Sequence, residues 1–424
     1  MAENLIYEPL VSVIIPAYNS EETIERAVWS VLDQDYENLE VVVVDDGSTD
    51  ETSDIVREMM GEDERVRLLR KPNGGVSAAR NDGIRAAFGE WFVTLDADDY
   101  VDQGMLRRLV ETAEETGADT VLCGFRMVYD NGRKKAFRVE EDYTDDKEEF
   151  IDAMFVELYD RHLISTHSNQ LYSMKIVRQN RILYNERLSV NEDIDFVLRY
   201  LRYCETISVI RGVYLNYVQQ EMGKSLNTTF QQYGISSSLL VLRDCDALFS
   251  DLDLSDHVYD EMNNRMLMHI CSFVGLMYYR SGYSDEDKIK QLKKLCDNDE
   301  FQQLLADTRP KGLKLKVAHF LLKRGMVKEY HALCRLFYRT KPGLGVPEGS
   351  VRVTDDGYDL LEDELPTISD RYTSNDGIDT DLIITAMREE QPENVQPKAF
   401  KVTKEDIKEL QKRLNSDSIS EENL

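Results

Sequence analysis

The sequence predicts an α/β fold whose first hundred residues form a mostly parallel sheet. Two observations carry this prediction. Short, continuous apolar runs alternate with segments of helical periodicity, which is typical of parallel strands covered on both faces. Polar and acidic clusters directly follow three of these runs. Because ligands bind outside the carboxyl ends of parallel strands, we expect the three clusters to line one crevice.

The first strand and helix signals lie close to the N-terminus. The apolar run 11–15 is the first predicted strand, and a helix follows from an N-cap at Ser20. The fully apolar run 41–44 predicts the second strand. Ser48 and Glu51 have the spacing of a capping box, so we expect the second helix to begin there.

The same alternation continues along the chain, and from about residue 230 to 340 the pattern is mostly helical. The further predicted elements are a strand over 66–69, a helix over 77–88, a strand over 91–95, a helix over 105–113, and a strand over 119–129 that turns at 130–132.

The composition limits the classes of protein that fit. The 424 residues carry a formal net charge of −29, which disfavours nucleic-acid binding, and 42% are hydrophobic, as in a soluble globular protein. The six cysteines stand singly without a C-x-x-C pair, which indicates reduced thiols. A signal-peptide pattern and an apolar run of ~20 residues are both missing. We therefore expect a cytoplasmic protein.

Three carboxylates lie within four residues in the stretch Asp96-Ala97-Asp98-Asp99. A pair about 4 Å apart costs roughly 4 kcal/mol at an effective dielectric near 20. A divalent cation would relieve this repulsion, and hard oxygen ligands suit Mg²⁺ or Mn²⁺ with substrate phosphates completing the shell. A solvated acidic loop explains the tetrapeptide equally well.

A second acidic stretch, Asp45-Asp46-Gly47-Ser48, follows the second strand. Asp and Gly are ordinary turn residues and Ser48 is an ordinary helix cap, so a turn is the favoured interpretation of these residues alone. A carboxylate at this strand exit could instead accept a hydrogen bond from a base edge or a ribose hydroxyl.

Residues 11–102 resemble the nucleotide-sugar domain of family 2 inverting glycosyltransferases, which have the GT-A fold. Four stretches in the family's order and spacing carry the resemblance: VSVIIPAYNSEETIERAVWSVLDQ, VVVVDDGSTDET, NGGVSAARNDGI and WFVTLDADDY. The resemblance implies that Asp46 bonds the base, Asp96 lies near the ribose, and Asp98 holds Mn²⁺ or Mg²⁺ with Asp96. The implied nucleotide-sugar site comprises Pro16, Ala17, Tyr18, Asn19, Asp45, Asp46, Arg80 and Asp96.

The family also implies a catalytic base in a downstream Glu-Asp pair, which is Glu192-Asp193 here. By resemblance, Asp193 takes the acceptor proton with Glu192 as a helper, and the metal on Asp98 stabilises the departing diphosphate in a displacement with inversion. General bases contribute about 10²–10⁴-fold. The same acids also suit the first turn of a helix, where the helix dipole favours them.

Two features qualify the resemblance. Gln170 stands where family members often carry lysine, within Ser168-Asn-Gln-Leu-Tyr172. The Gln-x-x-Arg-Trp pattern of processive synthases is missing, so we expect single-sugar addition. The histidines lack H-E-x-x-H spacing, and His167, near the predicted acceptor side, is expected to be an ordinary surface or core residue.

We expect three parts in the chain: a GT-A-type catalytic domain over 1–225, a helical domain over 226–341, and an acidic, largely disordered tail over 342–424. The segment 309–341 carries ten Lys and Arg residues against one acid, Glu329. Its two basic amphipathic helices either lie on an anionic membrane or pack their apolar face on the protein. We favour peripheral attachment at the inner face of the cell membrane.

The resemblance therefore predicts a glycosyltransferase of cell-surface glycan or polysaccharide synthesis, with a UDP-sugar donor and a glycan or lipid-linked acceptor. Residues 16–19 read Pro-Ala-Tyr-Asn, and they lack the glycine-rich turn of a dehydrogenase or the basic loop of a nucleotidyltransferase. The alternative is a non-catalytic module of the same fold that acts as a membrane-associated scaffold. The crowded carboxylates argue against it.

Overall fold

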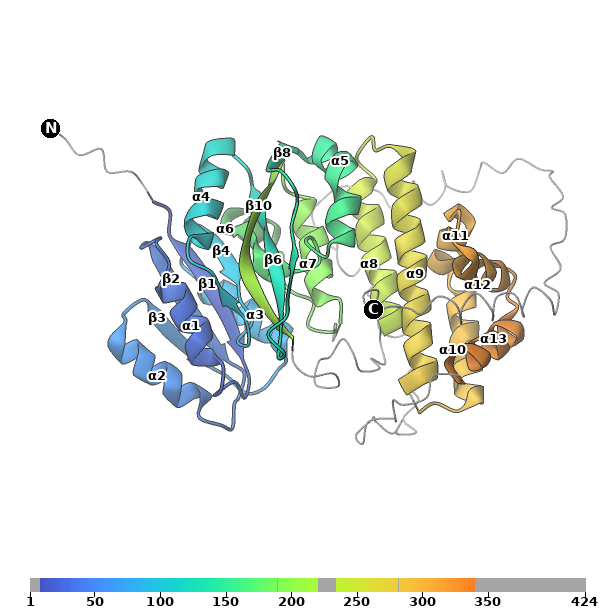
Figure 1. The fold of residues 1–424 in the computed structure, drawn as a ribbon, viewed down its shortest axis with the longest axis horizontal. Coiled ribbons are helices and arrows are strands. Elements are labelled where there is room, and N and C mark those ends of the chain that lie inside the picture. The colour runs from blue at the N-terminus through green and yellow to red at the C-terminus, as the bar shows by residue number, and fades with distance from the viewer. Residues whose placement is uncertain (1–7, 189, 220–233, 281, 340–424) are drawn as a thin grey trace. The chain divides into compact units, whose positions relative to one another are not determined.

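The structure is a computed structural model that describes residues 8–188, 190–219, 234–280 and 282–339 (Figure 1). All of these residues belong to one compact unit. The predicted tail 342–424 and the predicted boundary between residues 225 and 226 lie outside the described residues.

Within the described residues, ten strands form one mixed sheet in the order β3-β2-β1-β4-β9-β6-β10-β5, with β7 beside β6 and β8 beside β10 (Figure 1). The strands are β1 (Val11–Ala17), β2 (Leu39–Asp45), β3 (Val66–Arg70), β4 (Trp91–Thr94), β5 (Tyr100–Val101), β6 (Thr120–Tyr129), β7 (Lys134–Phe137), β8 (Tyr143–Asp146), β9 (Gln170–Ser173) and β10 (Thr206–Gln219).

The predicted parallel strands pair as expected. β1 lies parallel to β2 and to β4, and β2 lies parallel to β3. β9 then runs antiparallel between β4 and β6, and β10 is parallel to β6. Because two antiparallel steps restore the direction, β6 and β10 end at the same edge of the sheet as β1, β2 and β4. The polar clusters at the strand exits share this edge.

Helices cover both faces of the parallel strands. Val41 and Val43 of β2 join the main core with residues of α1 and α2, whereas Val42 and Val44 pack against Ala79 of α3 on the opposite face. The helices of the sheet domain are α1 (Ile24–Leu32), α2 (Thr52–Glu62), α3 (Val76–Ala86), α4 (Met105–Thr116), α5 (Lys147–Asp160), the 3₁₀ helix η1 (His167–Asn169), α6 (Met174–Asn180) and α7 (Glu192–Leu201).

The start of α2 differs from the prediction. The helix begins at Thr52, and the expected capping box of Ser48 and Glu51 does not form. The Ser48 amide instead donates to Asp45 Oδ1 at 2.8 Å, and Asp50 Oδ1 accepts the Thr52 amide at 3.1 Å. The strand exit therefore closes as a tight turn before the helix starts.

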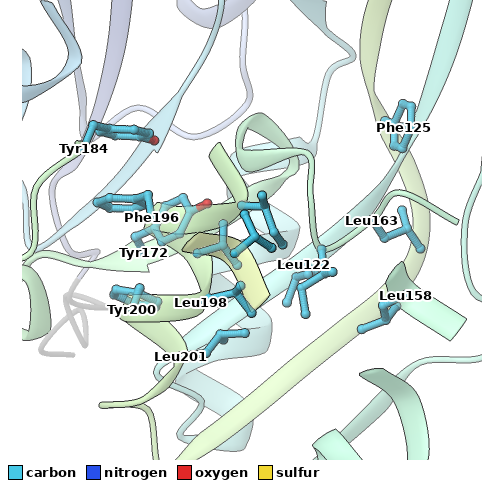
Figure 2. Packing of buried hydrophobic residues seen from close by; sticks show 14 of the residues in the cluster. Leu122, Phe125, Leu158, Leu163, Tyr172, Tyr184, Phe196, Leu198, Tyr200 and Leu201 are labelled. Atoms are coloured by element: carbon cyan, nitrogen blue, oxygen red, sulfur yellow. The ribbon is translucent and has the colours of Figure 1, made fainter. Parts of the chain in front are cut away.

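Aromatic side chains anchor α7 to the sheet domain. Tyr184 stacks on Phe196 with ring centroids 4.2 Å apart, and Tyr172 meets Phe196 edge-on at 5.5 Å (Figure 2). All three side chains are almost completely buried. Aromatic pairs at these distances are favourable beyond the area that they bury. This packing fixes the N-terminal turn of α7, which carries Glu192 and Asp193.

Within the described residues, six further helices follow the sheet domain, and the first two of them pack against it. They are α8 (Gly234–Phe249), α9 (Asp256–Arg280), α10 (Asp285–Asp297), α11 (Asp299–Asp307), α12 (Leu313–Lys323) and α13 (Val327–Arg339). α8 contacts α7, and α9 contacts α5. The Asn191 side-chain amide donates to Ser237 Oγ at 3.0 Å, and the rings of Phe155 and Phe249 meet edge-on at 5.2 Å.

The predicted basic helices are present as α12 and α13. Leu321 and Leu322 are buried, and Phe320 is partly buried against the core, whereas Lys314 and Lys316 are exposed. The apolar residues of this segment therefore mostly pack inward, although Leu313 and Leu336 are exposed. Among the described helices, none combines the length and the apolar character that crossing a bilayer requires.

Candidate active site

Tyr18 and Asn19 follow β1 at the edge of the sheet. Pro16 and Ala17 are buried, whereas the Tyr18 side chain beyond them is 51% exposed. Asn19 adopts a left-handed φ of 49°. The backbone amide of Asn19 donates to Ser48 Oγ at 2.9 Å, and its side-chain Oδ1 accepts the backbone amide of Thr49 at 2.9 Å. Asn19 therefore joins the exits of β1 and β2.

Asp45 builds the turn at the end of β2. Its buried carboxylate accepts the Ser48 amide and the Ser53 hydroxyl, and Arg70 Nε lies 3.3 Å from its Oδ2. Burial alone would raise the pKa of Asp45, but the hydrogen bonds from Ser48 and Ser53 and the charge of Arg70 bring it below its usual value. Both oxygens of this carboxylate are engaged within the protein.

Asp46 holds the loop that leads into α3. Its Oδ1 accepts the Gly74 amide at 2.9 Å and lies 3.1 Å from Lys71 Nζ, and its Oδ2 accepts the Gly75 amide at 2.7 Å. Gly75 has a φ of 91°, which favours glycine. Asp46 thus connects the exit of β2 to the helix that carries Arg80.

Arg80 gathers three carboxylates from two distant segments. Its Nη2 donates to Asp96 Oδ1 at 2.9 Å, and its Nη1 donates to Asp193 Oδ1 at 2.9 Å and to Glu192 Oε1 at 3.4 Å. The guanidinium is only 3% exposed and lies over the ring of Tyr184. Burial alone would lower the pKa of Arg80, but the charges of Asp96 and Asp193 outweigh burial and raise this pKa well above its usual value. Arg80 is therefore always charged.

His167 is the second basic neighbour of Asp193. The buried ring has its Nδ1 2.9 Å from Asp193 Oδ1, although this nitrogen does not make a hydrogen bond of regular geometry. Its Nε2 lies 3.2 Å from Ser168 Oγ and 3.9 Å from Asp96 Oδ1. The buried ring therefore lies within this cluster, at a position where the sequence predicts an ordinary surface or core histidine.

The two acids at the start of α7 have different electrostatic surroundings. Burial would raise the pKa of Asp193, but His167 and Arg80 lower it below its usual value. Burial and the adjacent Asp193 carboxylate raise the pKa of Glu192 to about 7. At neutral pH, Asp193 is therefore ionised, whereas Glu192 is present in both its protonated and its ionised form. Such a divergence between neighbouring acids is common at functional sites.

Asp98 and Asp99 provide oxygen ligands beside this cluster. Asp98 is half-buried, and Asp99 is buried with its Oδ1 accepting the Val218 amide at 2.8 Å. Asp99 Oδ2 has no hydrogen-bond partner among the described residues. Burial and the charges of Asp96 and Asp98 raise the pKa of Asp99 well above its usual value. The strand exit thus carries an excess of negative charge that a cation would offset.

The donor set fits a metal only together with a substrate. Within the described residues, no three histidine, cysteine or acidic side chains are arranged to hold a metal ion. Mg²⁺ and Mn²⁺ are often bound through one or two carboxylates with phosphate oxygens completing the shell. Asp98 meets this requirement, whereas Asp96 Oδ1 is already paired with Arg80.

The structure brings most of the predicted residues to one edge of the sheet. Arg80, Asp96, Glu192 and Asp193 are in direct contact, and Asp46 reaches them through the start of α3. Gln170 lies apart from this cluster. It is buried in β9 with its Nε2 donating to Thr120 Oγ1 at 2.8 Å.

Sequence reasoning did not find Lys71, which contacts Asp46, and it undervalued His167. Lys71 lies beside the recognised glycine pair, which could have drawn attention to it. His167 carries no local signal, because its partner Asp193 is reached only through the fold.

Residues 12–180 match the family model described as Glycosyl transferase family 2. The uncharacterized glycosyltransferase EpsJ of Bacillus subtilis (strain 168) is 33% identical over 216 residues, which are 49% of this chain and 60% of EpsJ. The putative glycosyltransferase EpsH of the same strain is 26% identical over 71% of this chain and 87% of its own length. The succinoglycan biosynthesis protein ExoO of Rhizobium meliloti (strain 1021) is 36% identical over 45% of this chain and 54% of its own length. The chain thus spans little more than half of EpsJ and ExoO.

A crystal structure of S. aureus TarS 1–349 in complex with UDP has a similar fold. The TM-score is 0.59 at 21% identity, and the match covers 80% of this chain and 94% of that one. At this identity the likeness concerns the fold alone. It confirms the predicted GT-A-type fold with a helical region after the sheet domain.

Proposed function

Because residues 12–180 match the model described as Glycosyl transferase family 2, we propose that the chain is an inverting glycosyltransferase. It moves a single sugar from a UDP-sugar to a hydroxyl of a glycan or lipid-linked acceptor in cell-surface polysaccharide synthesis. The descriptions of EpsJ and EpsH as glycosyltransferases support sugar transfer, and that of ExoO as a succinoglycan biosynthesis protein supports a role in polysaccharide synthesis. The UDP in the TarS structure supports the donor nucleotide.

One observation carries the proposal: Arg80 donates hydrogen bonds both to Asp96, which follows β4, and to Asp193, in the first turn of α7. A sugar transferase needs a group that holds the donor and a group that activates the acceptor within about one sugar's length of each other. Asp96 and Asp193 meet this need because both contact the same guanidinium.

In the proposed reaction, Asp193 is the general base. Although burial opposes ionisation, His167 and Arg80 keep the pKa of Asp193 below its usual value, so the carboxylate is charged at neutral pH. It accepts the proton of the acceptor hydroxyl as that oxygen attacks the anomeric carbon from the face opposite the diphosphate. Inversion follows from this single displacement. Glu192 assists because its protonation, with a pKa of about 7, changes the negative charge beside Asp193.

The donor would lie along the strand exits. The exposed ring of Tyr18 offers a stacking surface for a base, and Pro16, Ala17 and Asn19 shape the edge beneath it. Asp45 and Asp46 order the loops on either side of this edge. A Mn²⁺ or Mg²⁺ ion held by Asp98, with or without Asp96, would neutralise the charge that develops on the departing diphosphate.

Donor binding and hydrolysis test the proposal. We expect UDP-sugars to raise the melting temperature of the protein in the presence of Mn²⁺, because ligand binding stabilises the folded state by mass action. Slow Mn²⁺-dependent hydrolysis of the preferred UDP-sugar should fall by about 10²–10³-fold in Asp98→Ala. It should fall by about 10²–10⁴-fold in Asp193→Asn, with donor binding retained.

The same assays separate an enzyme from the scaffold alternative. A scaffold of the same fold would still bind UDP but would release no free sugar, and Asp193→Asn would change nothing. Failure of every UDP-sugar and of UDP itself to stabilise the wild-type protein would refute the proposed donor class.

We also propose that the exposed cations of α12 and α13 attract the protein to an anionic membrane surface. The inward packing of Leu321 and Leu322 supports an electrostatic contact in place of helix insertion. In vesicle flotation, Lys314→Glu combined with Lys316→Glu should reduce binding to vesicles that contain phosphatidylserine. Lys290→Glu with Lys293→Glu on α10 is the matched control. Equal flotation of all variants, or equal flotation on neutral vesicles, would rule out this contact.

A further inference from the structure

Two cations on the β6–β7 hairpin are held by aromatic rings. Arg133 Cζ lies 5.3 Å from the ring centroid of Tyr129, and Lys135 Nζ lies 5.1 Å from that of Phe137. Neither cation forms an ion pair with a residue that the structure describes. Many other arginines of this acidic protein pair with carboxylates, as Arg80 and Arg126 do. The charges of Arg133 and Lys135 are therefore positioned but not neutralised.

The face that bears these side chains continues into β10. Lys135 pairs with Met127 and Phe137 with Phe125, while Met127 also pairs with Tyr217 of β10. The rings of Phe125 and Phe137 stack at 4.9 Å, and Tyr217 meets Phe125 edge-on at 6.4 Å. Because strand residues alternate between faces, these side chains share one face of the sheet. We call Tyr129, Arg133, Lys135, Phe137 and Tyr217 the cation–aromatic face.

This face leads directly to the proposed reaction centre. The Val218 amide donates to Asp99 at 2.8 Å, which places the neighbouring Tyr217 at the acidic strand exit. The charges of Asp99, Asp96 and Asp193 accordingly add to burial in raising the pKa of Tyr217.

The other end of the face borders the segment that leads to His167. Phe137 meets the ring of His162 edge-on at 6.3 Å. The cation–aromatic face therefore extends from the acidic strand exit beside Tyr217 to His162, which lies five residues before His167.

We propose that the cation–aromatic face binds the acceptor and that this acceptor is an acidic saccharide bearing carboxylate or phosphate groups. Half-buried aromatic rings suit the apolar faces of pyranose rings, and Arg133 and Lys135 attract the acidic groups. The cation–π contacts of Arg133 and Lys135 are weak because both side chains are exposed. An ion pair with an anionic group can therefore replace these contacts. The inference rests on the proposed function, because an acceptor site presupposes transfer.

Charged residues on an edge strand also discourage pairing with other chains. Lys134 fills that role on the opposite face of β7, where no aromatic ring accompanies it among the described contacts. Within the hairpin, the cations that contact rings lie on the face that continues to Tyr217, which favours a recognition role for them.

Direct binding of labelled oligosaccharides to the full chain tests the inference. The probes are a hyaluronan oligosaccharide for carboxylates, a phosphorylated mannan oligosaccharide for phosphates, and a neutral chitin oligosaccharide of similar length. We expect at least one acidic probe to bind, more tightly at low salt, and the neutral probe to bind more weakly. Arg133→Glu with Lys135→Glu should weaken acidic-probe binding about tenfold or more. The comparison between the two acidic probes identifies the acidic group.

Lys290→Glu with Lys293→Glu on α10 is the control of equal charge change, and it should leave probe binding unaltered. UDP binding, measured on the same samples, should be equal in all variants. Equal weakening by both double substitutions, equal binding of the neutral probe, or no binding of either acidic probe would overturn the inference. If UDP binds while the acidic probes do not, the inference fails alone. If UDP also fails to bind, the proposed function fails.

Discussion

His167 Nδ1 and Arg80 Nη1 each lie 2.9 Å from the same oxygen of Asp193. One carboxylate oxygen therefore faces two nitrogen atoms that come from different segments. The arrangement restricts the orientation of the carboxylate, and it leaves the second oxygen as the atom available to an acceptor hydroxyl. We infer that His167 acts through Asp193 and is a positioning residue.

Replacing His167 by Ala should lower the turnover number more than it changes the KM for the donor. Loss of the ring lets Asp193 rotate, and misplacement of a catalytic group by about 1 Å can cost on the order of a hundredfold. Steady-state hydrolysis of a UDP-sugar measures both constants. An unchanged turnover number in His167→Ala would show that the ring does not position the base.

Glu192 makes a pH-dependent contribution to stability. The fold raises the pKa of Glu192 to about 7, whereas the pKa of a glutamate in an unfolded chain is about 4.3. The folded state thus binds more protons between these values, and stability falls as the pH rises from about 5 to 8. Glu192→Gln should be similar to wild type at pH 5 and more stable than wild type at pH 8. Urea unfolding at both pH values tests this, and a difference that does not grow with pH contradicts it.

The individual residues of the site were only partly predictable. Asp96 and the Glu192-Asp193 pair were located by resemblance, and the structure brings them together, while their catalytic roles remain proposals. The contact of Arg80 with Asp193 joins residues 113 positions apart, which no local pattern reveals. Asp45 looked like a ligand candidate or a turn residue, and its hydrogen bonds to Ser48 and Ser53 show that it forms the turn.

Among the elements, α3 depends on one close contact with the sheet. At Gly83 an added Cβ would collide with Ile14 Cγ2 and approach Val44 Cγ2 to 3.3 Å. Ile14 and Val44 are completely buried, so they cannot readily move aside. Because Arg80 lies one turn before Gly83 on the same helix, this contact sets the position of the guanidinium.

Gly83→Ala should lower the free energy of unfolding by about 1–3 kcal/mol, because overpacking outweighs the better helix propensity of alanine. The hydrolytic rate should fall with it as α3 and Arg80 shift. Gly61→Ala in α2 is the matched control, since an added Cβ meets no atom within 4 Å there. It should raise stability by up to about 1 kcal/mol. Chemical denaturation of both variants decides the matter, and equal effects would contradict the packing argument.

The sequence predicted the elements whose signals are local. The apolar runs 11–15 and 41–44 became β1 and β2, and the hairpin signal at 130–132 lies between β6 and β7. β5 and β9 were missed, because Tyr-Val is too short to show a pattern and Gln-Leu-Tyr-Ser, unlike the equally short β4, is not a continuous apolar run. Their strand character comes from pairing with β10, β4 and β6, which lie far away in sequence.

At the scale of the whole molecule, the helices after the sheet domain complete its core. α8 covers α7 and α9 covers α5, with Leu239 and Val241 of α8 buried. Polar contacts secure the junction, including that of the Ser255 amide with Asp152 Oδ1 at 2.7 Å. The Asn191 contact with Ser237 Oγ on α8 therefore adds a second support to the N-terminal turn of α7.

A protein that ends after residue 219 should consequently be less stable than one that ends after residue 339. Removing α8 and α9 exposes the apolar sides of α7 and α5, and exposed patches of this kind promote aggregation. We expect loss of the cooperative thermal transition and loss of UDP-sugar hydrolysis in the shorter protein. Calorimetry and size-exclusion chromatography provide the measurement, and a monomeric, cooperatively folding shorter protein would contradict the prediction.

The way in which Arg80 reaches its partners also explains why this position requires an arginine. Its two terminal nitrogens point to carboxylates on opposite sides, Asp96 from one and Asp193 from the other. A lysine carries the same charge on a single nitrogen and cannot span this fork. Arg80→Lys would therefore keep the positive charge beside Asp193 and still disconnect Asp96 from Asp193, so the forked shape of the arginine matters in addition to its charge.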